Sequence, residues 1–233
     1  MTIAAPARAP LGTVGTLVGD QIGRLQRGYL DDRSESVAAL ARLRRGAGED
    51  PLAVPDLWGL IELDGLHEDA DLSSENSLIQ AQNAVCTAMT LWALHQQSRR
   101  TGMHRTGGLE LGSAVRRLMP VGAIDEPVRK RFVRVGSAPS LKVLSVRMRD
   151  LVTLLRRDEI GLDYALLADQ LHLWQRPGGR DGVRRSWGRS FHAAVAPMRK
   201  DSTPAESPTA DPDGDDVSDR TSAHDDSDTK DVQ

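Results

Sequence analysis

The stretch LKVLSVRMRDLVTLLRRDEIGLDYALLADQLHLW, residues 141–174, decides the fold class of this 233-residue chain. Its first half spaces apolar side chains alternately three and four residues apart, the period of one face of an α-helix. This first series is Leu141, Leu144, Met148, Leu151 and Leu155. Asp163, a residue type that caps helices, precedes a second series with the same period. The second series is Tyr164, Leu167, Leu171 and Trp174. Two helices, each burying one face, are therefore predicted here.

The same periodicity extends outward to about residues 12 and 197. A short helix capped by Asp56 is also expected in the segment PLAVPDLWGLIELDG. The chain has no sustained alternation of apolar and polar residues and no Asn-Gly hairpin, which argues against strands. The fold is therefore predicted to be all-α, built from two small helical bundles. The further predicted helices cover residues 18–29, 37–43, 78–99, 111–118, 127–135 and 183–194.

Breaks in composition predict the domain organisation. Gly102, Gly107 and Gly108 interrupt the helical pattern and mark a boundary between the two bundles, of which the second is expected to hold four to five helices. The last residues are mostly Asp, Ser, Thr, Pro and Gly, with almost nothing to bury. The expected parts are a flexible arm (1–11), an N-terminal helical domain (12–104), a C-terminal helical bundle (105–199) and a disordered acidic tail (200–233).

The charge is divided unevenly along the chain. Residues 201–233 hold 11 of the 33 acidic residues but only two of the 30 basic ones, so this tail carries −9 and the preceding residues carry +6. A basic body with an acidic tail favours contact with a polyanion. Cys86 is the only cysteine, and no run of 18 apolar residues or signal peptide is present. A cytoplasmic protein without a membrane partner is expected.

Signatures of catalysis and of cofactor binding are missing from the sequence. Gly12, Gly15 and Gly19 do not form a dinucleotide fingerprint or a P-loop. The acidic loop at 62–75 fails as a calcium loop, because Ser74 stands where the turn glycine belongs. The six histidines show no metal-binding spacing. The chain is therefore predicted not to be an enzyme and to use no cofactor or metal.

Basic residues carry the strongest functional signal. Residues 129–157 contain nine Lys or Arg and one acid, Asp150. Lys142, Arg149 and Arg156 are spaced by seven and so form one stripe along a helix, which suits a chain of phosphates. The predicted nucleic-acid-binding residues are Arg44, Arg45, Arg129, Lys130, Arg131, Arg134, Lys142, Arg147, Arg149 and Arg156.

The aromatic residues refine the expected mode of binding. There are eight, and they mostly fall on the apolar faces of predicted helices, so they are expected in the core. Bases would then find no aromatic platform on which to stack. The contacts that remain join charge to phosphate, which gives affinity without sequence information.

The order of these motifs resembles the CasB family, the small subunits of the type I-E CRISPR surveillance complex called Cascade. The resemblance spans roughly residues 35–195. It rests on ALARLRRG (39–46), LWALHQQ (91–97), LELGSAVRRL (109–118), VRKRFVRV (128–135), the stretch 141–174 and VRRSWGRSF (183–191). It implies two helical bundles, an architectural role and no active site.

The resemblance also implies partners for the chain. These are the other Cascade subunits, a second copy of the chain, and the guide RNA and target DNA, where the subunit helps to hold the R-loop open while base pairing reads the sequence. By position, the basic residues named above would be its backbone contacts.

Two other classes of function remain open at this stage. A helical transcription regulator would need polar base-reading residues at the start of a recognition helix, whereas the helix predicted at 127–135 is filled with Arg and Lys. A scaffold or adaptor without nucleic-acid contact would use the same cations in salt bridges with a protein partner.

Overall fold

The computed structural model describes residues 10–49 and 53–194. In these two ranges the chain forms eight α-helices, and its extended pairing is limited to one isolated bridge between His104 and Leu162. The all-α prediction is confirmed. Most of the expected arm and the whole acidic tail lie outside the described residues. None of the helices in the described ranges is long and apolar enough to span a membrane.

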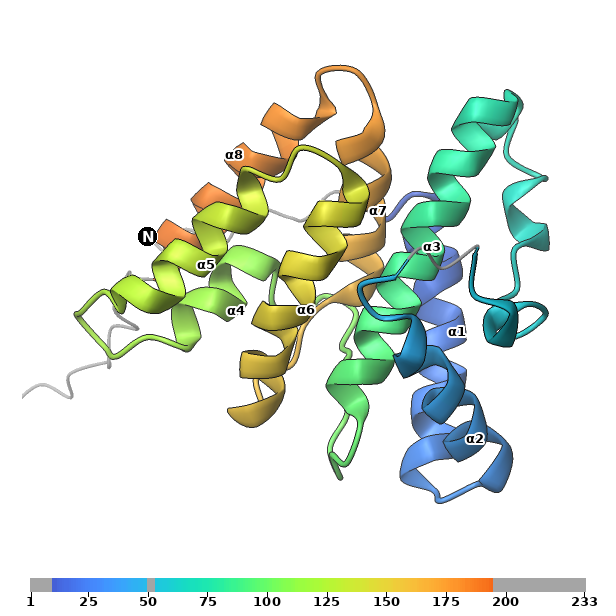
Figure 1. Cartoon of the computed structure of the whole chain (residues 1–233), viewed down its shortest axis with the longest axis horizontal. Helices are drawn as coiled ribbons and strands as arrows, with labels where there is room; N and C mark the ends of the chain where they lie inside the picture. The colour runs from blue at the N-terminus through green and yellow to red at the C-terminus, as the bar shows by residue number, and fades with distance from the viewer. Residues whose placement is uncertain (1–9, 50–52, 195–233) are drawn as a thin grey trace, which may run out of the picture. The chain divides into compact units, whose positions relative to one another are not determined.

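The connections between the helices differ in length, and the longest one joins α2 to α3 (Figure 1). The α-helices are α1 (Thr13–Leu30), α2 (Ser34–Leu43), α3 (Glu75–Gln96), α4 (Leu111–Arg117), α5 (Glu126–Gly136), α6 (Leu141–Arg157), α7 (Tyr164–Gln175) and α8 (Gly179–Ala193). The 3-10 turns described in full between α2 and α3 are η1 (Arg44–Gly46), η3 (Pro55–Leu57), η4 (Asp64–Leu66) and η5 (Ala70–Leu72).

Side-chain caps begin several helices, as the residue types suggest. The predicted cap at Asp163 is confirmed, because its carboxylate accepts the Leu166 N–H at the start of α7. The predicted cap at Asp56 is wrong. Asp56 lies inside η3, where Pro55 takes the first position of the turn, and its carboxylate pairs with Arg45 instead.

The start of α1 is capped from a helix that is distant in the sequence. Asp169 on α7 accepts the backbone N–H groups of Gly12 and Gly15 at 2.8 and 2.6 Å. A side chain on Gly15 would overlap this carboxylate, so glycine is required for the close approach of α1 to α7. Burial raises the pKa of Asp169, while the two N–H donors oppose that shift. The first and seventh helices are thereby joined.

Helices α3 and α7 occupy the centre of the core. Trp92 on α3 and Trp174 on α7 are almost fully buried, and α7 packs against both α1 and α3. The apolar core runs continuously from Val14 to Phe191, so residues before and after position 104 share it. Whether 12–104 and 105–199 fold as separate domains stays a prediction.

A buried polar network links these central helices. Nδ1 of His95 on α3 lies 2.9 Å from the hydroxyl of Tyr164, whose backbone N–H donates to Nδ1 of His104 at 3.1 Å. Burial lowers the pKa of His95 to about 3 and lowers that of His104 as well. Burial also raises the pKa of Tyr164. Both histidines are therefore held neutral in the folded protein.

We expect acid to destabilise the fold below pH 6.5. Between that value and pH 3, His95 takes up a proton in the unfolded chain but not in the folded one. The unfolded state then binds more protons, so the free energy of unfolding falls as the pH falls. Between pH 7 and pH 5, the protonation of His95 in the unfolded chain should lower the free energy of unfolding by roughly 2 kcal/mol, at about 1.4 kcal/mol per pH unit. Urea denaturation at the two pH values measures this loss. His95→Gln should reduce the pH dependence, whereas His67→Gln, at an exposed position, should keep it; equal slopes in the two variants would contradict this account.

Candidate nucleic-acid interface

Helix α5 presents a set of cations to solvent. Val128 and Val135 are buried on its inner side. Lys130, Arg131 and Arg134 are exposed, and their side chains make no hydrogen bond or ion pair to any described residue. Lys130 and Arg134, four residues apart, share one face of the helix. These three cations are available to an external anion.

Two other predicted cations of this region are already engaged. Arg129 pairs with Glu126 on its own helix, at 2.8 Å between Nη2 and Oε2. Arg147 on α6 donates to the backbone carbonyl of Arg134. Arg147 therefore holds α6 against the end of α5, and its guanidinium is less available to a ligand than those of the exposed cations.

Two of the three members of the predicted stripe on α6, Lys142, Arg149 and Arg156, face solvent. Lys142 and Arg149 are exposed and have no partner in the described ranges. Arg156 is half-buried and donates to Oε1 of Gln97 at 3.1 Å and to the carbonyl of Leu94 at 3.4 Å. The last member of the stripe thus fastens α6 to the end of α3.

The turn after α2 reaches the outer face of α6. Gly48 has a φ of +87°, and a Cβ atom placed on it would lie 3.3 Å from Cδ of Arg149 and 3.7 Å from Cα of Val146. Arg44 and Arg45 lie in η1, four and three residues before this glycine. Arg45 also pairs with Asp56 at 3.1 Å, in a bridge that is largely exposed.

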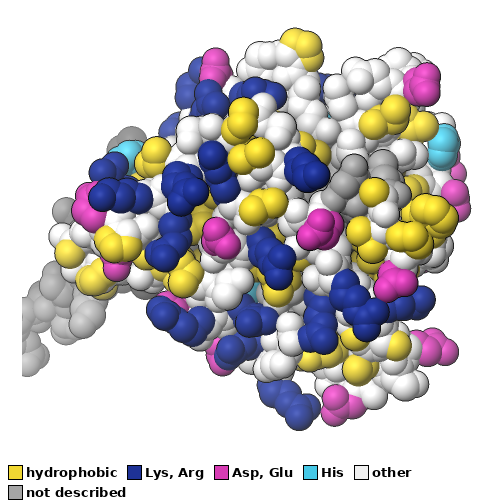
Figure 2. Space-filling view, in the orientation of Figure 1, with side chains coloured by type: hydrophobic (Ala, Val, Ile, Leu, Met, Phe, Trp, Pro, Cys, Tyr) yellow, Lys and Arg dark blue, Asp and Glu magenta, His cyan; other side chains and the backbone are white. Residues whose placement is uncertain are grey.

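Figure 2 shows many Lys and Arg side chains on the face of the molecule that is seen in Figure 1. Dark-blue side chains gather over α5 and α6 and again over the region of α2 and η1, with few acidic side chains between them. We call this surface the basic face. Its members are Arg44, Arg45, Lys130, Arg131, Arg134, Lys142 and Arg149. Such a surface can neutralise several phosphates of one strand.

One aromatic residue departs from the expected burial. Trp58 directly follows η3 and is 69% exposed, while the other three tryptophans are at most 1% exposed. Leu57 takes the buried position of this segment instead. The prediction that the aromatic residues lie in the core is therefore wrong for Trp58. The sequence contained a signal for this exposure, because Trp58 stands in a Pro-punctuated segment that lacks the helical period of a buried face.

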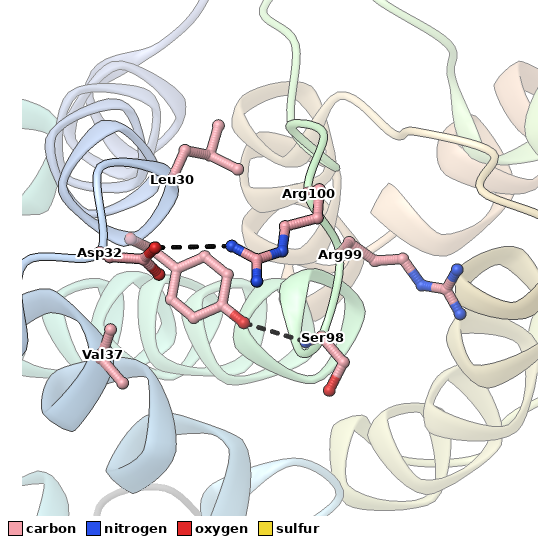
Figure 3. A pocket seen from close by; sticks show the side chains of 7 residues that line it. Leu30, Asp32, Val37, Ser98, Arg99 and Arg100 are labelled. Carbon is pink, nitrogen blue, oxygen red and sulfur yellow. Dashed lines mark hydrogen bonds and ion pairs between the residues drawn. The ribbon is translucent and has the colours of Figure 1, made fainter.

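A pocket away from the basic face contains two cations, Arg99 and Arg100, that already form ion pairs with carboxylates. It is lined by Leu30 at the end of α1, Val37 on α2 and Ser98 just after α3, among others (Figure 3). Arg100 reaches across to Asp32 at 3.5 Å, and Arg99 turns away to Glu159 at 2.6 Å. This pairing makes the pocket a poorer site for a polyanion than the basic face.

The acidic loop at 62–75 is used structurally. Asp69 accepts hydrogen bonds from the Thr13 hydroxyl at 2.5 Å and from the Asp71 N–H at 2.9 Å, and these bonds lower its pKa. Glu62 pairs with Arg24. Across residues 10–49 and 53–194, no three His, Cys, Asp or Glu side chains are grouped as a metal site would require.

Comparison with known proteins places this fold among CRISPR-associated proteins. The family model described as CRISPR-associated protein Cse2 matches residues 39–192. The crystal structure of CasB from Thermobifida fusca is similar at 52% identity with a TM-score of 0.72, over 78% of this chain and 99% of that one.

More distant solved structures share the fold. A Cse2-family protein from Thermus thermophilus has 24% identity and a TM-score of 0.55, over 77% of this chain and 97% of its own. A chain from a CRISPR RNA-guided surveillance complex has 17% identity and a TM-score of 0.56, over 78% of this chain and 95% of its own. A search of curated proteins gave no match.

Proposed function

Because this chain belongs to the Cse2 family of CRISPR-associated proteins, we propose that it is a non-catalytic subunit of an RNA-guided surveillance complex. In this role it binds nucleic-acid backbone without reading sequence and stabilises the R-loop on target DNA. Its partners are the other subunits, a second copy of itself, the guide RNA and the target DNA, and it acts in the cytoplasm during antiviral defence.

One observation carries the nucleic-acid part of this proposal. Two parts of the chain that are far apart in the sequence, η1 and the neighbouring helices α5 and α6, contribute cations to the basic face. Five of these cations, Lys130, Arg131, Arg134, Lys142 and Arg149, have no acceptor among the described residues. A surface lined by one sign of charge raises the local concentration of a polyanion.

The charge pattern also favours backbone contact over sequence readout. Lys and Arg side chains on helix surfaces neutralise phosphates, whose position is the same for every sequence. In an RNA-guided complex, sequence is read by pairing between guide and target, so the protein needs only to hold the strands. A scaffold that used these cations solely against an acidic protein surface would leave nucleic acid unbound.

The experiment that tests this role is assembly with and without the chain. Coexpressed with the other subunits of its complex and a guide RNA, the chain should copurify with them. A complex prepared without it should still carry the guide but open target DNA less, measured by reactivity of the displaced strand to a single-strand-specific probe. Failure to copurify, or equal opening by the two complexes, would contradict the proposal.

A further inference from the structure

We propose that the pocket between the turn at residues 102–109 and the end of α4 binds a phosphate group, which Arg105 and Arg117 hold between them. The inference goes beyond the proposed function, because neither arginine belongs to the basic face or to the nucleic-acid-binding residues predicted from the sequence. The phosphate belongs either to a nucleic-acid strand or to a free phosphate compound, and these two sources can be told apart by experiment.

The pocket is an open cavity with a glycine floor. Its volume is about 510 Å³, within the roughly 300–1,000 Å³ of small-ligand sites. Half of its lining residues are glycines: Gly102, Gly107, Gly108 and Gly161. Glycine lets a ligand approach the backbone closely. Neither Asp nor Glu is among its described lining residues, so the lining itself supplies no carboxylate to its cations.

The turn that carries Arg105 is fixed to the segment between α6 and α7. The N–H of Arg105 donates to the carbonyl of Leu162 at 3.4 Å. Two residues later, the N–H of Gly107 donates to the buried carboxylate of Asp163 at 2.8 Å. Gly107 has a φ of +75°, and a Cβ atom on Gly108 would lie 2.7 Å from the carbonyl oxygen of Arg105, so both positions favour glycine. The backbone of the site is thus in place before a ligand binds, which lowers the cost of binding.

The two arginines reach the pocket from separate segments. Arg105 lies in the turn, whereas Arg117 is the last residue of α4. Both side chains are exposed, and neither guanidinium makes a hydrogen bond or ion pair to a described residue. A guanidinium offers its N–H donors in a planar fork that matches the oxygens of a phosphate, and such charge-assisted bonds are stronger than neutral ones. Two free forks at one cavity therefore favour an anion.

The rest of the lining favours a phosphate with its sugar over a base or an apolar group. Leu109 is the single apolar side chain among the described lining residues, and none of them is aromatic. A base would therefore find no ring on which to stack. Thr106 adds a hydroxyl to the lining. The pocket is suited to charge and hydrogen bonding, which are the properties of a phosphate group.

Thermal unfolding in inorganic phosphate tests the site in the full chain. At constant ionic strength, set with chloride, phosphate should raise the melting temperature of the parent, because a ligand of the folded state stabilises it. Arg105→Ala combined with Arg117→Ala should lose most of this rise. The matched control, Arg176→Ala combined with Arg189→Ala, removes the same charge from exposed positions elsewhere and should keep it. No rise in the parent, or an equal rise in all three proteins from a general salt effect, would overturn the inference.

A salt series with a single-stranded oligonucleotide identifies the source of the phosphate. If the strand supplies it, the double variant of Arg105 and Arg117 should lower the slope of log affinity against log salt by about 0.7, the value of one phosphate contact. An unchanged slope, together with the lost response to inorganic phosphate, assigns the site to a free phosphate compound. A decrease of about 1.4 would mean two separate contacts and would overturn a shared site.

Failure of this inference is distinguishable from failure of the proposed function. Variants of Lys142 and Arg149 test the basic face, whatever the pocket binds. If the double variant of Arg105 and Arg117 responds to phosphate like the parent but no longer assembles with the other subunits, the two arginines contact a protein partner. The inference then fails while the proposed function stands.

Discussion

Replacing Lys130, Arg134, Lys142 and Arg149 together by Ala should lower the slope of log affinity against log salt by about 3. Each phosphate contact on a single strand contributes about 0.7 to that slope. These four side chains are exposed and have no partner among the described residues, so each is available to one phosphate. The measurement is the affinity for two unrelated single-stranded oligonucleotides over a salt series, with the same loss expected on both.

The fold should tolerate this quadruple change. Substitutions at exposed positions usually alter stability within about 0.5 kcal/mol. In an assembled complex we expect weaker opening of target DNA with guide RNA loading intact. The matched control removes four exposed cations from other parts of the molecule: Arg27, Arg33, Arg176 and Arg189.

The control also guards against an effect of net charge alone. It lowers the positive charge of the chain by the same amount, so it should leave the slope near the parental value. If control and test variants reduce the slope equally, affinity depends on total charge and no basic face exists. If neither reduces it, the cations serve another purpose and the scaffold function gains support.

Gly112→Ala should destabilise the protein by about 3 kcal/mol or more, at the upper end of the cost of overpacking. Gly112 lies on α4 against α8, where an added Cβ would overlap the carbonyl oxygen of Trp187 and lie 2.7 Å from the backbone nitrogen of Phe191. These are backbone atoms, which cannot swing aside as a flexible side chain can. The two helices would have to move apart, and the packing around Trp187 and Phe191 would be lost with them.

Gly188→Ala, on the facing helix α8, should have the opposite effect. No described atom lies within 4 Å of where its Cβ would be, and Gly in a helix interior costs roughly 0.5–1 kcal/mol relative to Ala. Urea denaturation of the two variants beside the parent measures both changes. Destabilisation of similar size in both variants would show that helix propensity, and not the contact between α4 and α8, decides their stability.

Local patterns in the sequence were enough to predict the helices. The spacing of Leu144, Met148 and Leu151 identifies the buried face of α6, and each is fully buried. The cap at Asp163 follows from residue type and position alone. These features depend on neighbours within a few residues, so local sequence patterns are enough to predict them. The cluster of cations on α5 and α6 is visible for the same reason.

The sequence by itself therefore determined an all-helical chain with a concentration of positive charge between residues 129 and 157. Only the tertiary structure decided which cations are engaged by distant groups. Arg147 donates to the carbonyl of Arg134 on α5, and Arg156 donates to the end of α3 and to the residue after it. It also brought Gly48 to α6 and left Trp58 exposed. The physical reason is that helical period is set by local backbone geometry, whereas a side chain's partner and exposure depend on which distant helices the packing of the core brings beside it.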